Sequence, residues 1–569
     1  MRNDTLVSKK FGEFFLPTIL MAASASLSII IDSVIIGNIL GESELAAINL
    51  IMPLSLCFTA ISAMFGIGSS ACISMFKGKM ENKNADRCLT LSFAAWILFG
   101  VVTTVLGLSA STPIAAFLSG DSGLNELVQD YLRVYLIGAP FTFATLIFPH
   151  IIKADGQPGL SSKSLILANA SNLALDVVFM KYFSMGITGA ALATIAGNIA
   201  GTLIYIVYII SRKRTLHFTR ITLSDTHLYA DMFKMSISSI FGQGLMFAKM
   251  WVFNMIISTA AGKAGLTTFS VCTSCLSFVS MFISGGAQTM IPMVSAFEGA
   301  QDNTAISFTV KKAFKLVLGC CIAITVLFEL FPEVVMSVYG IDDSEIIAMG
   351  KIAIRLFAIS FAFTGFTFMF MYYAQAKRMP AFSMQICALD GFVIIVPAGI
   401  LLAWLFGANG IWLSYVVNGV LVTAFIVARS HHTVKRSNGE LYSIFMLGKT
   451  HDNIIEMSVD VSDENAVSDA VKRIGEHIKS GNTDRILYYM FELSKCAYRK
   501  KTGLVKGDTA DIVFDEKELT FKDLGTDYRL LPDNTYIAEI RELSREYENT
   551  VMIGINYSKV IFDGKEATA

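Results

Sequence analysis

Long apolar runs alternate with short polar connections from the N-terminus to about residue 430. Each run reaches the length of about 20 residues that a helix needs to cross a bilayer. The runs lie near residues 14–40, 46–75, 88–110, 128–152, 162–183, 187–210, 235–260, 264–294, 311–332, 347–375, 381–405 and 409–429. The pattern predicts an all-α polytopic membrane protein with twelve transmembrane helices.

The chain repeats itself at an offset of 222 residues. The stretch from Asp32 (DSVIIGNILGESELAAINL) aligns without gaps onto the stretch from Asn254 (NMIISTAAGKAGLTTFSVC), and Pro158 falls on Pro380. Because six spans per half is an even number, both halves enter the membrane from the same side, which is the parallel-repeat plan of some transporters. We expect two six-helix bundles, an N-lobe over residues 1–220 and a C-lobe over residues 221–436.

Basic side chains concentrate in every second connection between the spans, and acidic ones in the others. The basic set is Lys77, Lys79, Lys83, Arg87, Lys153, Lys163, Arg212, Lys213, Arg214, Arg220, Lys311, Lys312, Lys377, Arg378, Arg429, Lys435 and Arg436. The acidic set is Glu42, Glu44, Asp121, Glu126, Asp342, Asp343 and Glu345. The positive-inside rule then predicts a multi-pass protein of the cell membrane with both termini in the cytoplasm.

After Arg436 the composition becomes charged and mixed, which predicts a separate cytoplasmic α/β sandwich domain over residues 450–569. The expected order is a strand at 454–461, a helix opened by Ser462, a helix at 484–500, strands at 511–514 and 519–523, a helix at 537–548 and a last strand at 551–562.

Overall composition supports the membrane assignment and excludes several classes. Hydrophobic residues make up 54% of the chain, charged residues 16%, and the mean hydropathy is +0.58. Membrane lipid is therefore an expected partner, while a formal net charge of -1 gives no reason to expect nucleic acid. The nine cysteines lie in apolar runs, at a span edge or in the tail, so neither disulfides nor a metal site is predicted. No catalytic constellation is apparent, and we predict neither an enzyme nor a cofactor.

Asp32 is the only charged residue between Phe14 and Gly41, within the first span. A carboxylate near the middle of a spanning helix costs about 3 kcal/mol on insertion scales, so such a residue is rarely retained unless it binds a cation, pairs or relays protons. Asp32 is therefore the first candidate for a functional centre.

The fifth and sixth spans add further oxygen ligands. Asn172 and Asp176 are four residues apart and project from one helix face, while Thr194 lies on the returning sixth span. With Asp32 they offer two carboxylates, an amide and a hydroxyl, which suits Na⁺ or a carboxylate pair that shares a proton. In the repeat, Asp32 falls on neutral Asn254, so the acidic pair occurs in one lobe only. This asymmetry favours ion coupling over architecture.

The second half carries a different polar set in its spans. Gln243, Lys249 and Asn254 lie on the seventh span, and Asp390 lies on the eleventh. Lys249 and Asp390 would either pair with each other or line a cavity between the lobes, and the sequence leaves both open. Arg133 and Arg355, which occupy equivalent places in the two halves, are interpreted as architectural.

Two stretches carry a specific resemblance to a known family. IDSVIIGNILGESELAAINLIMPL and AMFGIGSSACISMFKG resemble the first two spans of the multidrug and toxic compound extrusion family, and the likeness extends over about residues 10–430. The resemblance implies a cation site at Asp32, Asn172, Asp176 and Thr194. It also implies doubt about a second Na⁺ site in the C-lobe, because the seventh span has Gln243, Lys249 and Asn254 where some members have an acidic residue.

The tail resembles the anti-sigma-factor type of histidine-kinase-like ATPase domain through LTFKDLGTDYRL and IAEIRELSREYENTVMIGINYSKVIF. The likeness implies a nucleotide-reading turn at Asp523 and Gly525. Cys496 stands where the family has its Mg²⁺-binding Asn, and Ala538 stands where it has a phosphate-loop glycine. A degenerate, regulatory domain with a cytoplasmic protein partner is therefore expected.

Together these features predict a secondary active antiporter that exports amphipathic organic compounds in exchange for H⁺ or Na⁺. Two alternatives are a lipid-linked sugar flippase of the same broad fold and a non-transporting membrane sensor that anchors a signalling tail. A flippase would favour a cationic groove for pyrophosphate, and the sensor would lack cation-dependent efflux.

Overall fold

The computed structural model describes residues 2–120, 123–211, 214–338, 344–449, 454–477, 482–515 and 518–562. The charged connection residues Asp121, Arg212, Lys213, Asp342 and Asp343 lie outside this part. The N-lobe is built from α1 (Thr5–Ile39), α2 (Glu42–Leu50), α3 (Met52–Ala63), η1 (Met64–Gly68), α4 (Ser69–Gly78), α5 (Asn82–Ser109), α6 (Ser111–Ser119), α7 (Asn125–Ile137), α8 (Ala139–Ala154), α9 (Pro158–Val177), η2 (Val178–Tyr182) and α10 (Gly186–Ile210).

The C-lobe follows with the same kind of helices. Its elements are η3 (Leu223–Thr226), α11 (His227–Gly299), α12 (Asn303–Leu330), α13 (Pro332–Val338), α14 (Ser344–Ala376), α15 (Pro380–Ala388), η4 (Leu389–Val393), α16 (Ile395–Phe406) and α17 (Ala408–Arg436). Helices dominate because the bilayer offers no partner to an open backbone, so each spanning segment must satisfy its own N–H and C=O groups.

Ten helices of the described chain are long and apolar enough to cross a membrane, and α7 with α8 forms an eleventh span bent by 57°. Helix α11 counts once among the ten, although its 73 residues contain Gly262 at φ 54° and ψ −144°. A straight helix would separate Phe253 from Phe269 by about 24 Å, yet their rings lie 6.3 Å apart. The chain therefore doubles back at Gly262. The two halves of α11 are two separate spans, which raises the count for the described chain from eleven to twelve. The predicted twelve helices are confirmed.

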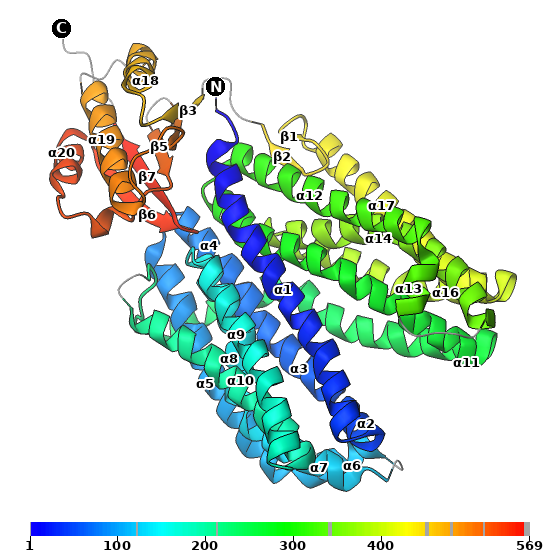
Figure 1. Cartoon of the computed structure of the whole chain (residues 1–569). Coiled ribbons are helices and arrows are strands. Elements are labelled where there is room, and N and C mark those ends of the chain that lie inside the picture. The colour runs from blue at the N-terminus through cyan, green and yellow to red at the C-terminus, as the bar shows by residue number, and fades with distance from the viewer. Residues whose placement is uncertain are drawn as a thin grey trace.

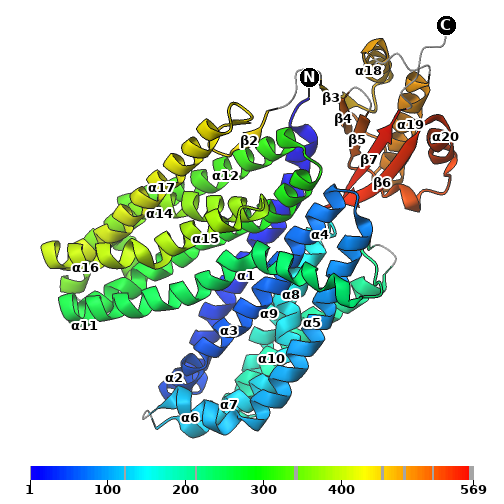
Figure 2. The ribbon, with the colours of Figure 1, turned by 180° about the vertical axis from the view of Figure 1, so that it is seen from behind.

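The two lobes diverge from a common end. Figures 1 and 2 show that the bundles approach each other at the end that carries the C-terminal domain and separate toward the opposite end. We call these ends the tail side and the far side. On the tail side, α4 and α11 cross in backbone contact: a Cβ added to Gly78 would lie 2.0 Å from the Ala296 carbonyl oxygen, and one added to Gly299 would lie 2.2 Å from that of Met75.

The linker after α17 forms a small hairpin of β1 (Leu441–Tyr442) and β2 (Leu447–Gly448). The tail domain then contains β3 (Ile455–Asp460), α18 (Glu464–His477), α19 (Thr483–Lys501), β4 (Thr509–Asp515), β5 (Glu518–Asp523), η5 (Tyr528–Leu530), α20 (Thr535–Leu543), β6 (Glu546–Met552) and β7 (Ile555–Ile561). Its antiparallel sheet has the order β3-β4-β5-β7-β6. The helices lie on the side of the sheet that faces away from the membrane helices (Figures 1 and 2), which gives the expected two-layer α/β domain.

The end of the tail differs from its sequence prediction. The predicted helix at 537–548 ends at Leu543, and the predicted last strand is a hairpin of β6 and β7. Ile553 and Gly554 both have positive φ, 49° and 74°, which is the backbone of a two-residue hairpin turn. The apolar run VMIGI hides this turn because its only turn residue is a single glycine.

Candidate functional site

The carboxyl groups of Asp32 and Asp176 interact with each other across the interface of α1 and α9. Asp176 is fully buried, while Asp32 is partly exposed. The Nδ2 atom of Asn169 donates a hydrogen bond to the Ser24 Oγ atom at 3.1 Å, which fixes the same two helices against each other about two turns away. The structure thus brings together two acidic residues that are 144 positions apart in the sequence.

The amide and the hydroxyl of the predicted site also meet. The Asn172 Nδ2 atom donates to the Thr194 Oγ1 atom at 3.4 Å, and the Thr194 hydroxyl donates to the Ala190 carbonyl oxygen at 3.1 Å. One residue that the sequence did not indicate joins them. Tyr131 of α7 is buried, lies beside Thr194 and interacts electrostatically with both carboxyl groups. The only signal for it was the Tyr131 and Tyr135 spacing of four residues, which is also typical of ordinary packing.

The Asp176 carboxylate has unused capacity to bind a cation. Neither of its oxygens has a regular hydrogen-bond partner among the described residues, although both are buried. A buried carboxylate without donors is costly unless a proton or a cation neutralises it. A cavity of about 580 Å³ adjoins the site and is lined by Val34, Ile35, Asn38, Ile39, Val177 and Lys181. The donor set contains only oxygen atoms, so the chemistry fits H⁺ or Na⁺.

Among the described residues of the C-lobe, the polar side chains do not form a second acidic pair. Asp390, in η4, accepts a hydrogen bond from the Asn418 Nδ2 atom at 2.9 Å. Lys249 and Asp390 both lie near the Cys387 thiol. Gln243 is partly exposed and Asn254 is exposed, both on the first half of α11.

The Asp523 carboxylate of the tail already accepts hydrogen bonds from residues of its own domain. Its Oδ1 atom accepts from the Gly525 backbone N–H at 2.7 Å and from Asn556 Nδ2 at 2.8 Å, and its Oδ2 atom accepts from the Tyr528 hydroxyl. Burial raises the pKa of Asp523, and these donors oppose that rise. The turn could therefore read an adenine only after Tyr528 or Asn556 moved away.

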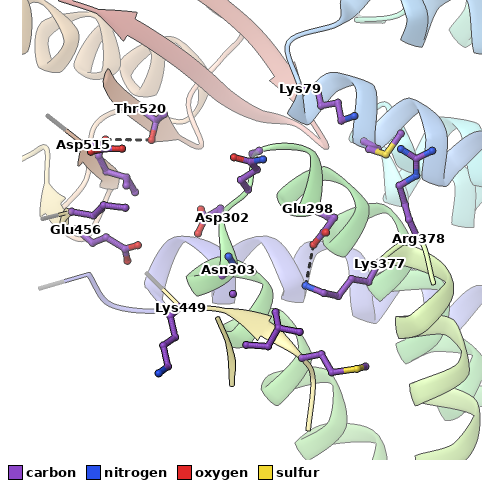
Figure 3. A pocket seen from close by; sticks show the side chains of 18 of the residues that line it. Lys79, Glu298, Asp302, Asn303, Lys377, Arg378, Lys449, Glu456, Asp515 and Thr520 are labelled. Carbon is purple, nitrogen blue, oxygen red and sulfur yellow. Dashed lines mark hydrogen bonds and ion pairs between the residues drawn. The ribbon is translucent and has the colours of Figure 1, made fainter. Parts of the chain in front are cut away.

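A larger cavity, about 900 Å³, lies where the tail domain meets both lobes. Figure 3 shows Lys79 just after α4, Glu298 and Lys377 of the C-lobe, and Asp515 and Thr520 of the tail around it. Cations and carboxylates both line this cavity, and the Lys377 Nζ atom pairs with the Glu298 Oε2 atom at 3.2 Å. No sequence pattern indicated this cavity, because its walls come from three separate parts of the chain.

Comparison with known families gives a match over most of the membrane helices. The family model described as MatE matches residues 17–178 and 238–401, together more than half of the chain. The two matched segments start 221 residues apart, in agreement with the internal repeat.

Curated relatives and solved structures agree with this match. The chain is 22% identical over 406 residues to the multidrug export protein MepA of Staphylococcus aureus (strain MRSA252), covering 71% of this chain and 89% of MepA. It is 22% identical over 416 residues to MepA of Staphylococcus haemolyticus (strain JCSC1435), covering 72% and 90%. A structure titled "Crystal structure of MATE in complex with MaL6" shares the fold with a TM-score of 0.70 at 20% identity, over 76% of this chain and 98% of that one. A structure titled as the outward-facing conformation of a MATE family transporter gives 0.69 at 20% identity, over 76% and 97%.

Proposed function

Because this chain belongs to the MatE family of multidrug and toxic compound extrusion transporters, we propose that it is a secondary active antiporter. It exports amphipathic organic compounds and takes up H⁺ or Na⁺ in exchange. The observation that carries the proposal is the Asp32 and Asp176 pair, whose inner carboxylate is buried without a regular hydrogen-bond donor among the described residues. Such a pair is stable only when it holds a positive charge.

In the proposed mechanism the ion reaches the pair from the far side, through the cavity beside Val34 and Val177. Asn172, Thr194 and Tyr131 supply neutral polar groups around it. The bound ion removes the negative charge that favours a cationic or polar substrate, so the substrate leaves toward the far side. The neutralised lobe then returns to the state that opens on the tail side. The polar C-lobe residues Gln243, Lys249, Asn254 and Asp390 are proposed to line the substrate path.

The N-lobe over 1–220, the C-lobe over 221–436 and the tail over 450–569 are proposed to act as three units in the cell membrane. The tail side is assigned to the cytoplasm, because basic connection residues such as Lys79 and Lys377 lie beside the tail, where the positive-inside rule expects them. The divergence of the lobes toward the far side then corresponds to an outward-facing state. The tail domain is assigned a regulatory role.

Transport by purified protein in vesicles tests the function. We expect efflux of a fluorescent organic cation when a pH or Na⁺ gradient is imposed separately, and the effective gradient identifies the coupling ion. A protein that moves no substrate under either gradient would favour the membrane sensor, while movement of a lipid-linked sugar would favour the flippase.

Cysteine labelling in intact cells tests the orientation. Lys263, which is exposed at the far-side turn of α11, and Lys83, which is exposed at the start of α5, are replaced by cysteine one at a time. We expect an impermeant maleimide to label the chain with Lys263→Cys and to leave Lys83→Cys at the background of the unmodified chain. The reverse pattern would invert the membrane orientation and the direction of export.

A further inference from the structure

The tail domain is bonded to both lobes at once. Toward the N-lobe, the Thr550 Oγ1 atom of β6 donates to the Asn82 Oδ1 atom of α5 at 2.6 Å. The β6–β7 turn presses its backbone against Gly156, where an added Cβ would lie 2.4 Å from the Gly554 nitrogen. Toward the C-lobe, the Thr304 Oγ1 atom donates to the Glu456 Oε1 atom at 3.1 Å. We call the contacts of Thr550 and the β6–β7 turn with Asn82 and Gly156 the seam.

A buried charge cluster ties the tail more firmly to the C-lobe and to the start of α1. Both terminal nitrogens of Arg2 bond the Asp302 carboxylate at 2.8 Å, and its Nε atom lies 3.3 Å from Asp511 of β4. Lys522 of β5 pairs with the same Asp302. The side chains of Arg2, Asp302, Asp511 and Lys522 are at most 4% exposed. Burial alone would raise the pKa of Asp302, but Arg2 and Lys522 outweigh it and hold that pKa below its usual range. Separating buried partners leaves uncompensated charge, so this contact resists opening.

The linker adds a second attachment to the C-lobe. Phe445 stacks or packs edge-on with Phe314, Phe370 and Tyr373 at ring distances of 5.3 to 6.1 Å, and its carbonyl oxygen accepts from the Tyr373 hydroxyl. Apart from the start of α1, where Arg2 and Lys9 also bond the tail, the contact with the N-lobe is narrower by comparison. The polar cavity of about 900 Å³ separates the tail from Lys79 at the end of α4, so the tail and this part of the N-lobe are not packed against each other there (Figure 3).

The seam connects the tail domain to the N-lobe at the side where the two lobes must separate. Alternating transport requires the tail-side ends of the N-lobe and C-lobe to separate, including the crossing of Gly78 and Gly299. A domain bonded to both lobes cannot follow both of them. We propose that the tail domain is a clamp that holds these tail-side ends together: it stays with the C-lobe and the start of α1, and the seam must open before substrate enters from the tail side. The inference rests on the proposed transport function.

A reversible crosslink across the seam tests the clamp in the full chain. Asn82 and Thr550 are replaced by cysteine together, in a background where Cys57 and Cys496 are serine, and joined with a short reducible crosslinker. We expect transport to fall at least about tenfold when the pair is joined and to return on reduction. The matched control joins Asn303→Cys to Gly448→Cys, where a Gly448 Cβ would lie 3.0 Å from the Asn303 amide. That pair links the linker to the C-lobe, so the joined control is expected to transport normally.

A second variant loosens the seam without any thiol. Thr550→Ala removes one hydrogen bond and is expected to raise transport at limiting substrate by about two- to tenfold. Thr502→Ala, on an exposed part of the tail, is the matched control and should change nothing. A joined seam that transports at the wild-type rate, or a Thr550→Ala chain with an unchanged rate, would overturn the clamp.

The rate at which a maleimide labels Cys72 reports whether the tail-side ends of the two lobes have separated, independently of transport. This thiol is buried on α4 beside Asp231 of α11. The joined seam should protect Cys72 from a maleimide, and Thr550→Ala should expose it. If the reduced chain moves no substrate at all, the proposed transport function fails, and the Cys72 result still decides whether the seam controls this separation.

Discussion

Replacing Asp32 by asparagine is expected to abolish gradient-driven efflux and to leave the protein folded. An amide keeps the size of the side chain, but it cannot alternate between a charged and a neutral form, so the pair with Asp176 loses the negative charge that holds the ion. Efflux under an imposed pH or Na⁺ gradient should fall at least about 100-fold. Asp176→Asn should also be impaired strongly, because Asp176 is the fully buried member of the pair.

The internal repeat supplies a matched control for this prediction. Asn254 occupies the place of Asp32 in the second half and is exposed on α11. Asn254→Ala is expected to keep efflux within about threefold of the wild type. Wild-type efflux by purified Asp32→Asn would refute the coupling assignment, and a severe loss in Asn254→Ala would refute its restriction to one lobe.

The membrane part was predictable because its signals are local and strong. Each span needs about 20 apolar residues, and the bilayer permits little besides a helix at that depth. The repeat placed Asp32 opposite neutral Asn254 and so singled out one lobe before any geometry was known. The spacing of Asn172 and Asp176 then placed both on the face of α9 that meets α1 and α10.

The features that escaped prediction depend on contacts between distant segments. Tyr131 joins the site only because α7 packs beside α10, and nothing in its neighbourhood distinguishes it from a core tyrosine. Arg2 looks like an ordinary basic residue ahead of a first span, yet it is buried against Asp302 and Asp511. Asp523 lies in the turn for which the sequence predicted nucleotide reading, but Tyr528 and Asn556 occupy its oxygens. A motif specifies residue types, and the packing around it decides which hydrogen bonds remain available.

The crossing of α4 and α11 leads to the second large expected effect. Gly78 and Gly299 each meet the carbonyl of the facing helix, at 2.0 Å and 2.2 Å from the position of an added Cβ. Because the opposing atoms belong to the backbone, a rotamer change cannot relieve the clash. Gly78→Val should therefore prevent the tail side from closing.

Overpacking of this kind costs about 1–3 kcal/mol or more, and about 2 kcal/mol changes a two-state population roughly 30-fold. Gradient-driven transport by Gly78→Val is thus expected to fall by about that factor, while maleimide labelling of the buried Cys72 should increase. Gly319→Val, at a helical glycine with open space around it, is the control and should alter neither readout. Normal transport with Cys72 still protected would mean that the two lobes do not approach each other through these glycines during the cycle, because a closed tail side cannot accommodate the added side chain.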